Sequence, residues 1–255
     1  MRENKIERRP VSLALSGHNT VLRRSFDLYR RNFWPLTFFG GLFWIVLFVG
    51  PSLPNLEQEH YRVPYSIVAV ISILASIQVS YICVIWGSFQ ALLDRRISIA
   101  SALRQVSLRN VLRFVWTAGL SMVLVLIGVL ALVIPGLVVG VRLSMVAPVV
   151  VIEGKGGWQA LVRSWHLVKG RSLGVFRSLL VVSLPTMLVN AANQLLGHLG
   201  LVLEPLAATV ITIVVLACSV LAGTFSEVGL TVLYSDLVGS LSHTPSDLAR
   251  NARSG

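Results

Sequence analysis

The sequence predicts an all-α integral membrane protein, a bundle of six transmembrane helices, and three observations lead to this prediction. First, the 255-residue chain is 55% hydrophobic and only 13% charged, with a mean hydropathy of +0.76, which is too apolar for a protein whose surface meets water. Second, apolar runs long enough to cross a bilayer recur along the chain. Third, lysine and arginine are concentrated on one side of these runs.

The predicted spans are the apolar runs of about 17 residues or more. They cover residues 33–50, 64–93, 111–134, 136–152, 173–196 and 205–233. Pro135 alone separates the third span from the fourth, which predicts a tight hairpin. The spans form one membrane domain, residues 19–237, between an N-terminal tail (1–18) and a C-terminal tail (238–255).

The basic residues predict the orientation of these spans. All but two of the 22 Lys and Arg residues fall on one side, and the exceptions are Arg62 on the opposite side and Arg142 within the fourth span. The positive-inside rule therefore places both termini in the cytoplasm. This topology accounts for the net charge of +11 without a nucleic-acid partner. No cleavable signal peptide is predicted in the first 32 residues.

Amphipathic basic helices are predicted before the first and fifth spans, lying along the membrane interface. Their sequences align, with Leu22–Arg30 matching Leu161–Lys169, and a weaker copy, Ser101–Val106, precedes the third span. The chain therefore divides into three repeats of a basic interfacial helix plus a transmembrane hairpin. The residues expected to contact anionic headgroups or a protein partner are Arg24, Arg30, Arg163, Trp165 and Lys169. Simple attraction to headgroups is favoured over specific docking.

Four carboxylates lie close to the cytoplasmic side of the predicted spans. Asp94, Glu153 and Asp236 follow hairpins, where a helix C-terminus disfavours negative charge, so we expect arginine partners from the interfacial helices. Glu227 lies near the cytoplasmic end of the sixth span. An ion pair with a cytoplasmic arginine is favoured there over a role in proton coupling.

A polar cluster is predicted near the outer side of the membrane. Arg142 lies in the fourth span, and Asn190, Asn193 and Gln194 share one face of the fifth. Together they would bind an anionic headgroup or solute. The favoured alternative is structural, with Arg142 extending to the interface and the amides joining helices by hydrogen bonds.

Several stretches resemble a known bacterial family. The central part consists of Ile134–Gly136, Val141–Ser144, Ala147–Gly154 and Ala160–Gly170, with Arg24–Phe33 at the start and Leu233–Leu237 at the end. These stretches resemble proteins related to the glycerophosphoryl diester phosphodiesterase membrane-domain family. The resemblance implies a six-helix fold in the bacterial cytoplasmic (inner) membrane. It does not imply phosphodiesterase activity, because catalysis in that family belongs to a separate soluble domain.

No catalytic, nucleotide-binding or metal-ligating motif occurs in the chain, so neither enzyme activity, a cofactor nor a metal is expected. Two hypotheses for function remain. The favoured one is a non-catalytic scaffold, accessory or regulatory protein that acts through its basic cytoplasmic helices. The other is a carrier of lipid or of a small anionic solute that uses the cluster around Arg142. Membrane lipids with anionic headgroups are the expected partners in both cases.

Overall fold

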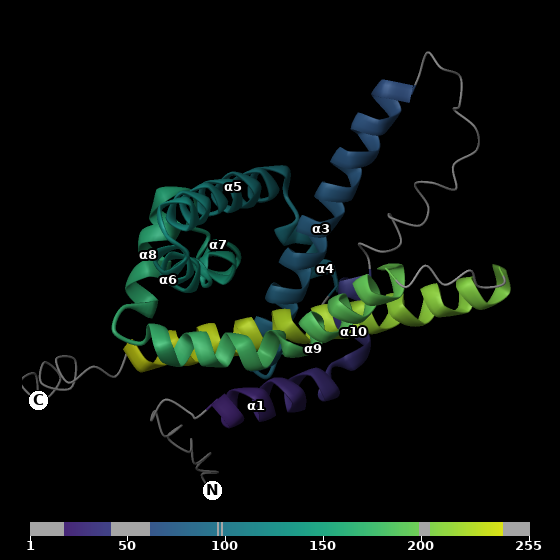
Figure 1. Cartoon of the computed structure of the whole chain (residues 1–255). Helices are drawn as coiled ribbons and strands as arrows, with labels where there is room; N and C mark the ends of the chain where they lie inside the picture. Colours follow the sequence, from purple (N-terminus) through teal and green to yellow (C-terminus); the bar gives the residue numbers. More distant parts are fainter. Residues whose placement is uncertain (1–17, 42–61, 96, 98, 199–204, 242–255) are drawn as a thin grey trace, which may run out of the picture.

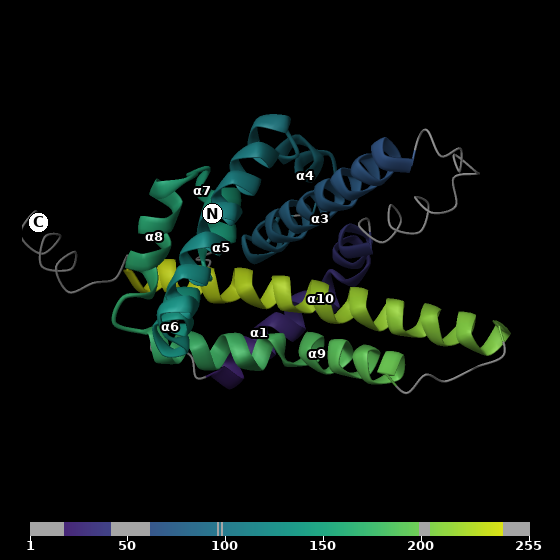
Figure 2. The same cartoon turned by 45° about the horizontal axis from the view of Figure 1, so that its top comes forward.

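The computed structural model describes residues 18–41, 62–95, 97, 99–198 and 205–241, and nearly all of them are helical (Figures 1 and 2). No strand occurs in this part of the chain. Four described helical segments are long and apolar enough to cross a membrane: Leu108–Ala131, Val133–Glu153, Ser172–Leu196 and Val210–Ser240. The all-α membrane class is therefore confirmed. The second half of the first predicted span, residues 42–50, lies outside the described residues, and so do residues 1–17 and 242–255.

The helices that correspond to the predicted spans have bounds close to those expected. They are α3 (Arg62–Leu92), α5 (Leu108–Ala131), α6 (Val133–Leu143), α7 (Val146–Glu153), α9 (Ser172–His198) and α10 (Pro205–Leu241). Residues 33–41 are also helical. Helix α10 continues to Leu241, past the predicted start of the C-terminal tail at residue 238, and Ser240 near its end accepts a hydrogen bond from Arg171.

Three further helices precede the helices of the spans: α1 (His18–Arg31), α4 (Ile99–Gln105) and α8 (Trp158–Val168). In α1 the buried residues Val21, Ser25 and Tyr29 recur every four positions, whereas Arg23 and Arg30 are exposed. This spacing places one face of the helix against the bundle. The Ser25 hydroxyl is buried and donates to the carbonyl of Val21 at 2.7 Å, so it needs no other partner.

The hairpin between α5 and α6 turns at Leu132, not at Pro135 as the sequence predicted. Leu132 is extended, with φ −170° and ψ 145°, and α6 begins at the next residue. Pro135 falls in the first turn of α6, where a missing N–H removes no helical hydrogen bond. Gly128 and Gly136 bring the two helices together, since a Cβ on Gly128 would lie 2.9 Å from the Cα of Gly136.

The fourth predicted span is two helices with a break between them. Helix α6 ends at Leu143 and α7 begins at Val146. Pro148, in the first turn of α7, has no N–H to donate to the carbonyl of Ser144, so a continuous helix would lose a hydrogen bond there. The Ser144 hydroxyl caps the last turn of α6 by donating to the carbonyl of Val141 at 2.7 Å. Arg142 therefore lies near the end of α6, next to the break within the apolar segment Val133–Glu153.

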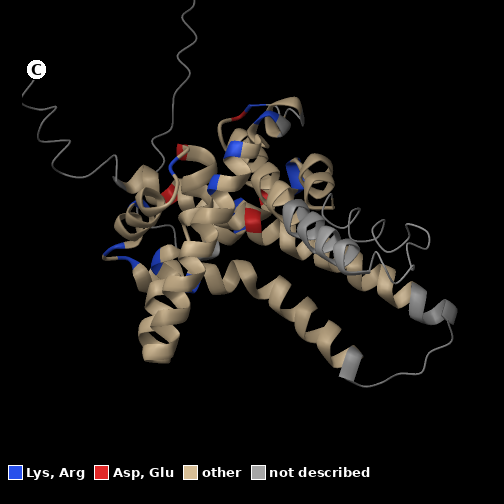
Figure 3. Cartoon of the chain, turned by 90° about the horizontal axis from the view of Figure 1, so that it is seen from above, with Lys and Arg blue, Asp and Glu red and all other residues tan. Residues whose placement is uncertain are grey.

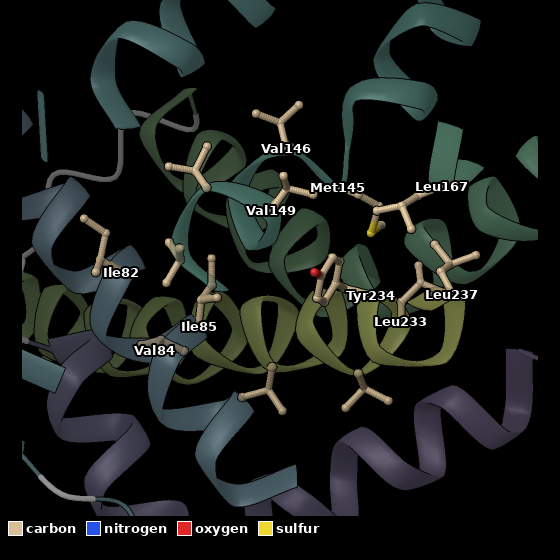
Figure 4. Close-up of a cluster of buried hydrophobic side chains, with 14 of the residues drawn as sticks. Ile82, Val84, Ile85, Met145, Val146, Val149, Leu167, Leu233, Tyr234 and Leu237 are labelled. Atoms are coloured by element: carbon tan, nitrogen blue, oxygen red, sulfur yellow. The ribbon is translucent and has the colours of Figure 1, made fainter. Parts of the chain in front are cut away.

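The core lies where α3, α7, α8 and α10 meet (Figure 4). Ile85, Met145, Val149, Leu167 and Leu237 are almost completely buried there. Because these residues come from four elements and from the break between α6 and α7, burying them fixes the position of the broken span.

Helices α9 and α10 form an antiparallel pair (Figure 2). The Thr186 hydroxyl lies 2.7 Å from that of Ser226 and 2.9 Å from the carbonyl of Ala222. Hydrogen bonds of this kind join helices in an apolar environment. One turn further, Gly229 packs against the buried side chain of Val182 with no room for a Cβ. The absence of a side chain at residue 229 therefore allows the two helices to approach.

Substituting Gly229→Ala should lower the thermal unfolding midpoint of the purified protein. The added methyl would overlap Val182, and overpacking costs about 1–3 kcal/mol, more than the gain in helix propensity of about 1 kcal/mol. Gly223→Ala is the matched control, because a Cβ at residue 223 would meet nothing within 4 Å. An equal midpoint for the two variants would show that the α9–α10 contact does not depend on Gly229.

Candidate functional site

Charged residues gather at one end of the bundle (Figure 3). This charged end comprises α4, α8, the C-terminal ends of α3, α7 and α10, and the N-terminal ends of α5 and α9. The free ends of the α5–α6 hairpin and of α9 carry no charged residue. Most charged groups of the described bundle therefore lie at one end.

Glu153, the last residue of α7, is the centre of a polar network at the charged end. Its carboxylate accepts hydrogen bonds from Arg163 Nε at 3.0 Å, from Lys155 Nζ at 2.6 Å and from the Tyr234 hydroxyl at 2.8 Å. Arg163 belongs to α8 and Tyr234 to α10, whereas Lys155 lies in the α7–α8 loop. The Glu153 side chain is only 17% exposed. One carboxylate thus joins three elements.

A second ion pair fastens α1 to the bundle. Arg24 Nη1 lies 2.5 Å from Asp236 Oδ1 on α10. The other oxygen of Asp236 is buried and has no hydrogen-bond partner among the described residues. Further along α1, the Tyr29 hydroxyl lies 3.0 Å from that of Thr37. Burial raises the pKa of Tyr29, and this hydrogen bond partly offsets the effect.

No ion pair of Asp94 or Glu227 occurs among the described residues, and the pairing expected for these two carboxylates stays a prediction. Asp94 is exposed in the turn after α3, with φ 53°. Glu227 is partly buried in α10, where its Oε2 is buried without a hydrogen-bond partner. It lies more than two helical turns before Asp236, which is too far along α10 to meet the arginine that Asp236 binds.

Arg142 lies against α8. Its guanidinium stacks over the Trp165 ring, with Cζ 4.3 Å from the ring centroid, an arrangement that favours a cation. The Arg142 carbonyl accepts a hydrogen bond from the buried Ser164 hydroxyl at 2.7 Å. Arg142 Nε is buried and has no hydrogen-bond partner in the described part of the chain. These contacts place Arg142 near the charged end.

The predicted cluster of Arg142 with three amides is wrong. Asn190, Asn193 and Gln194 are exposed on α9, and Val141, next to Arg142, lines a groove together with Phe176 near the start of that helix. Phe176 and Asn190 are separated by about 21 Å along an α-helix. The packing of α6 against α9 explains the error, because the α9 residues that line their shared groove lie between Phe176 and Met187, before the three amides.

The remaining contact residues predicted from the sequence fall into two groups. Arg30 and Lys169 are exposed, so they are available to headgroups or to a partner. Arg24, Arg163 and Trp165 are only partly exposed, and each has a partner within the protein. Two arginines expected to face outward therefore hold the interfacial helices in place.

The sequence interpretation missed polar residues at the start of α5. Arg113 Nη1 donates to the carbonyl of Gly154 at 2.7 Å, and the Thr117 hydroxyl accepts from the backbone N–H of Gly157 at 2.7 Å. Both bonds hold the loop between α7 and α8. Arg113 and Thr117 are four residues apart, so they share one helix face, and this spacing was the only signal of their role in the sequence.

Two cavities lie near these groups. An apolar cavity of about 440 Å³ lies between the α5–α6 hairpin and α8, and both tryptophans of α8, Trp158 and Trp165, line it. A smaller cavity of about 230 Å³, with several polar side chains, lies between α3, α5 and α7. Across the described ranges, no group of three or more His, Cys, Asp or Glu residues is arranged to hold a metal ion.

Removing Arg163 should destabilise the protein more than removing Lys155. The Arg163 side chain is 33% exposed and that of Lys155 is 43% exposed, and Arg163 alone joins two helices. We expect Arg163→Gln to cost about 1–3 kcal/mol and Lys155→Gln less than about 1 kcal/mol, measured as shifts in thermal midpoint. Arg30→Gln is the control for loss of an exposed charge. The reverse order for residues 163 and 155 would contradict the role given to Glu153.

Comparisons with known proteins identify a family but no activity. The model of a domain of unknown function, DUF7847, matches residues 60–237. No curated protein and no solved structure matches the chain. The resemblance to the glycerophosphoryl diester phosphodiesterase membrane-domain family remains a prediction. The family match includes α3 to α8, α9 and most of α10, and covers more than half of the chain, so this protein belongs to the DUF7847 family.

Proposed function

We propose that the chain is a non-catalytic membrane scaffold or accessory protein that binds a protein partner through the basic surfaces of α1 and α8. One observation carries this proposal. In each helix one arginine, Arg24 or Arg163, forms an ion pair with the bundle, whereas other basic residues of the two segments, such as Arg30 and Lys169, are exposed. A surface held in a fixed orientation with free cations suits an acidic partner.

The proposed orientation places the charged end in the cytoplasm of a bacterium, with six spans crossing the inner membrane. The bias of Lys and Arg supports it. The position of Arg142 adds support, because the arginine that the sequence placed inside a span contacts α8 at the charged end. Arg62 then remains the one basic residue proposed to lie outside.

The proposed repeat has three units, each a short helix followed by two transmembrane segments. Equivalent positions with equivalent roles support it: Arg24 and Arg163 each bind a carboxylate at the C-terminal end of a long helix, and the next residues, Ser25 and Ser164, are both fully buried. At the matching position the middle unit has Gln105. A glutamine cannot supply the charge, which accounts for the missing ion pair at Asp94.

The carrier hypothesis has less support. It required a charged cluster at one depth, and Arg142 lies apart from the exposed amides of α9. The proposed function therefore relies on the exposed basic residues of the interfacial helices.

Membrane orientation can be tested by cysteine labelling in intact cells. In a Cys83→Ser/Cys218→Ser background, a membrane-impermeant maleimide should label Glu57→Cys, which lies outside the described residues in the segment predicted to be external. Arg109→Cys, at the start of α5 and exposed, should react only after the membrane is permeabilised. The opposite pattern would reverse the proposed topology.

Partner binding can be tested with a charge-reversal variant that leaves both anchoring arginines intact. Cross-linking and purification in mild detergent should recover a partner with the natural protein, and Arg30→Glu/Lys169→Glu should reduce recovery by about tenfold or more, because close charge pairs across an interface contribute at least 1.5 kcal/mol.

The control is Arg95→Glu/Arg109→Glu, which makes the same change in net charge at exposed residues of the charged end. It should retain the partner. Equal loss in both variants would indicate general electrostatic attraction, and no specific recovery with the natural protein would contradict the scaffold role.

A further inference from the structure

The polar cavity at the charged end has an unusual set of lining groups. Its volume is about 230 Å³, and it lies between α3, the start of α5 and the end of α7. Trp86, Gln105, Asn110, Arg113 and Glu153 contribute its polar side chains. A single water molecule occupies about 30 Å³ in the liquid. The cavity can therefore hold a small chemical group.

Trp86 supplies a hydrogen-bond donor with nothing to bind. Its Nε1 is buried and has no hydrogen-bond partner in the part of the chain that the structure describes. An indole N–H can only donate, and a buried donor without an acceptor is unfavourable. The missing partner must be an acceptor, and the described side chains do not provide it.

Arg113 adds positive charge and further donors. It donates one described hydrogen bond, from Nη1 to the carbonyl of Gly154, and a guanidinium has five N–H groups. The one carboxylate of the cavity, Glu153, already accepts from Arg163, Lys155 and Tyr234. Arg113 therefore has N–H groups left for a further acceptor, whereas the carboxylate of Glu153 is already bound by three donors.

The cavity lies at the depth where phospholipid headgroups meet the hydrocarbon. Trp86 lies about 9 Å from the C-terminal end of α3, and Arg113 lies about 8 Å from the start of α5. Both of these helix ends belong to the charged end. A group dissolved in the cytoplasm and a headgroup in the inner leaflet can both reach this level.

From this arrangement we propose that the cavity binds a phosphate group, with Trp86 and Arg113 as the donors that recognise it. Phosphate oxygens accept several hydrogen bonds at once, and guanidinium groups bind them in a forked geometry. The phosphate belongs either to a free anion or to an anionic phospholipid. The site uses none of the residues of α1 and α8 assigned to partner binding, so each proposal can fail without the other.

The decisive variant is Trp86→Phe, which keeps an aromatic ring and removes the N–H. Binding should weaken by about tenfold to a hundredfold, the range expected for one hydrogen bond to a charged group. Without ligand, the thermal midpoint should stay unchanged or rise, because an unpaired buried donor is removed. A purely structural role for Trp86 would lower the midpoint instead.

Two probes distinguish the sources of the phosphate. Equilibrium dialysis of the full chain in mild detergent measures inorganic phosphate, and native mass spectrometry after reconstitution with phosphatidylglycerol or phosphatidylcholine measures retained lipid. Trp116→Phe is the matched control, because that indole is 71% exposed on α5 and lies outside the cavity. Arg113→Lys keeps the positive charge but loses the paired N–H donors of the guanidinium, so it should also weaken binding.

Phosphate binding that falls in Trp86→Phe and not in Trp116→Phe supports a site for a free anion. Retention of phosphatidylglycerol that falls in the same variant, without binding of inorganic phosphate, supports a headgroup site. If neither probe binds, or if Trp86→Phe binds as well as the natural protein, the proposal is wrong.

Discussion

The arrangement of the charged end depends on the carboxylate of Glu153. A negative charge at a helix C-terminus faces the negative end of the helix dipole, so Glu153 needs nearby cations. Arg163 and Lys155 provide them, and Tyr234 adds a hydroxyl. Because these groups come from α8, from its preceding loop and from α10, satisfying one carboxylate fixes three parts of the chain. The Arg113 bond to Gly154 then holds the same loop from α5.

Helix α8, held in place in this way, contacts Arg142 next to the break after α6. The Ser164 hydroxyl binds the carbonyl of Arg142, and the Trp165 ring supports the Arg142 guanidinium. The first contact benefits from the end of α6 near Leu143, because a continuous helix would use that carbonyl for its own hydrogen bond. The cost of interrupting the span is offset by contacts with α8. The charge of Arg142 thereby lies close to the other cations at the charged end.

Hydroxyl groups inside the apolar helices form hydrogen bonds in two ways. Ser121 and Ser219 each donate to the carbonyl four residues earlier, at 2.8 Å, so they add no unpaired donor to the apolar surface. Thr186 and Ser226 instead meet between α9 and α10, where they join the two helices. Whether a hydroxyl bonds within its own helix or to a neighbouring helix therefore depends on its position in the bundle and not on its residue type.

The sequence alone determined the helical class, the approximate bounds of the long helices and the separation of charged from apolar residues. These properties are local, since apolar length and helical periodicity report which solvent each segment prefers. It also indicated that carboxylates at helix ends would require cations. The three-residue error at the α5–α6 turn arose because Pro135 fits equally well in a turn and in the first turn of a helix.

Only the tertiary structure decided which arginine reaches which carboxylate, where Arg142 points and that Trp86 lines a polar cavity. Asp94 and Asp236 both lie near the end of a long helix, but of these two only Asp236 forms an ion pair with an arginine among the described residues. Arg142 and Asn190 are both polar residues in predicted spans, but α6 packs beside an earlier part of α9 and Arg142 contacts α8. Such relations depend on how helices distant in sequence pack together, and local hydropathy carries no information about that packing.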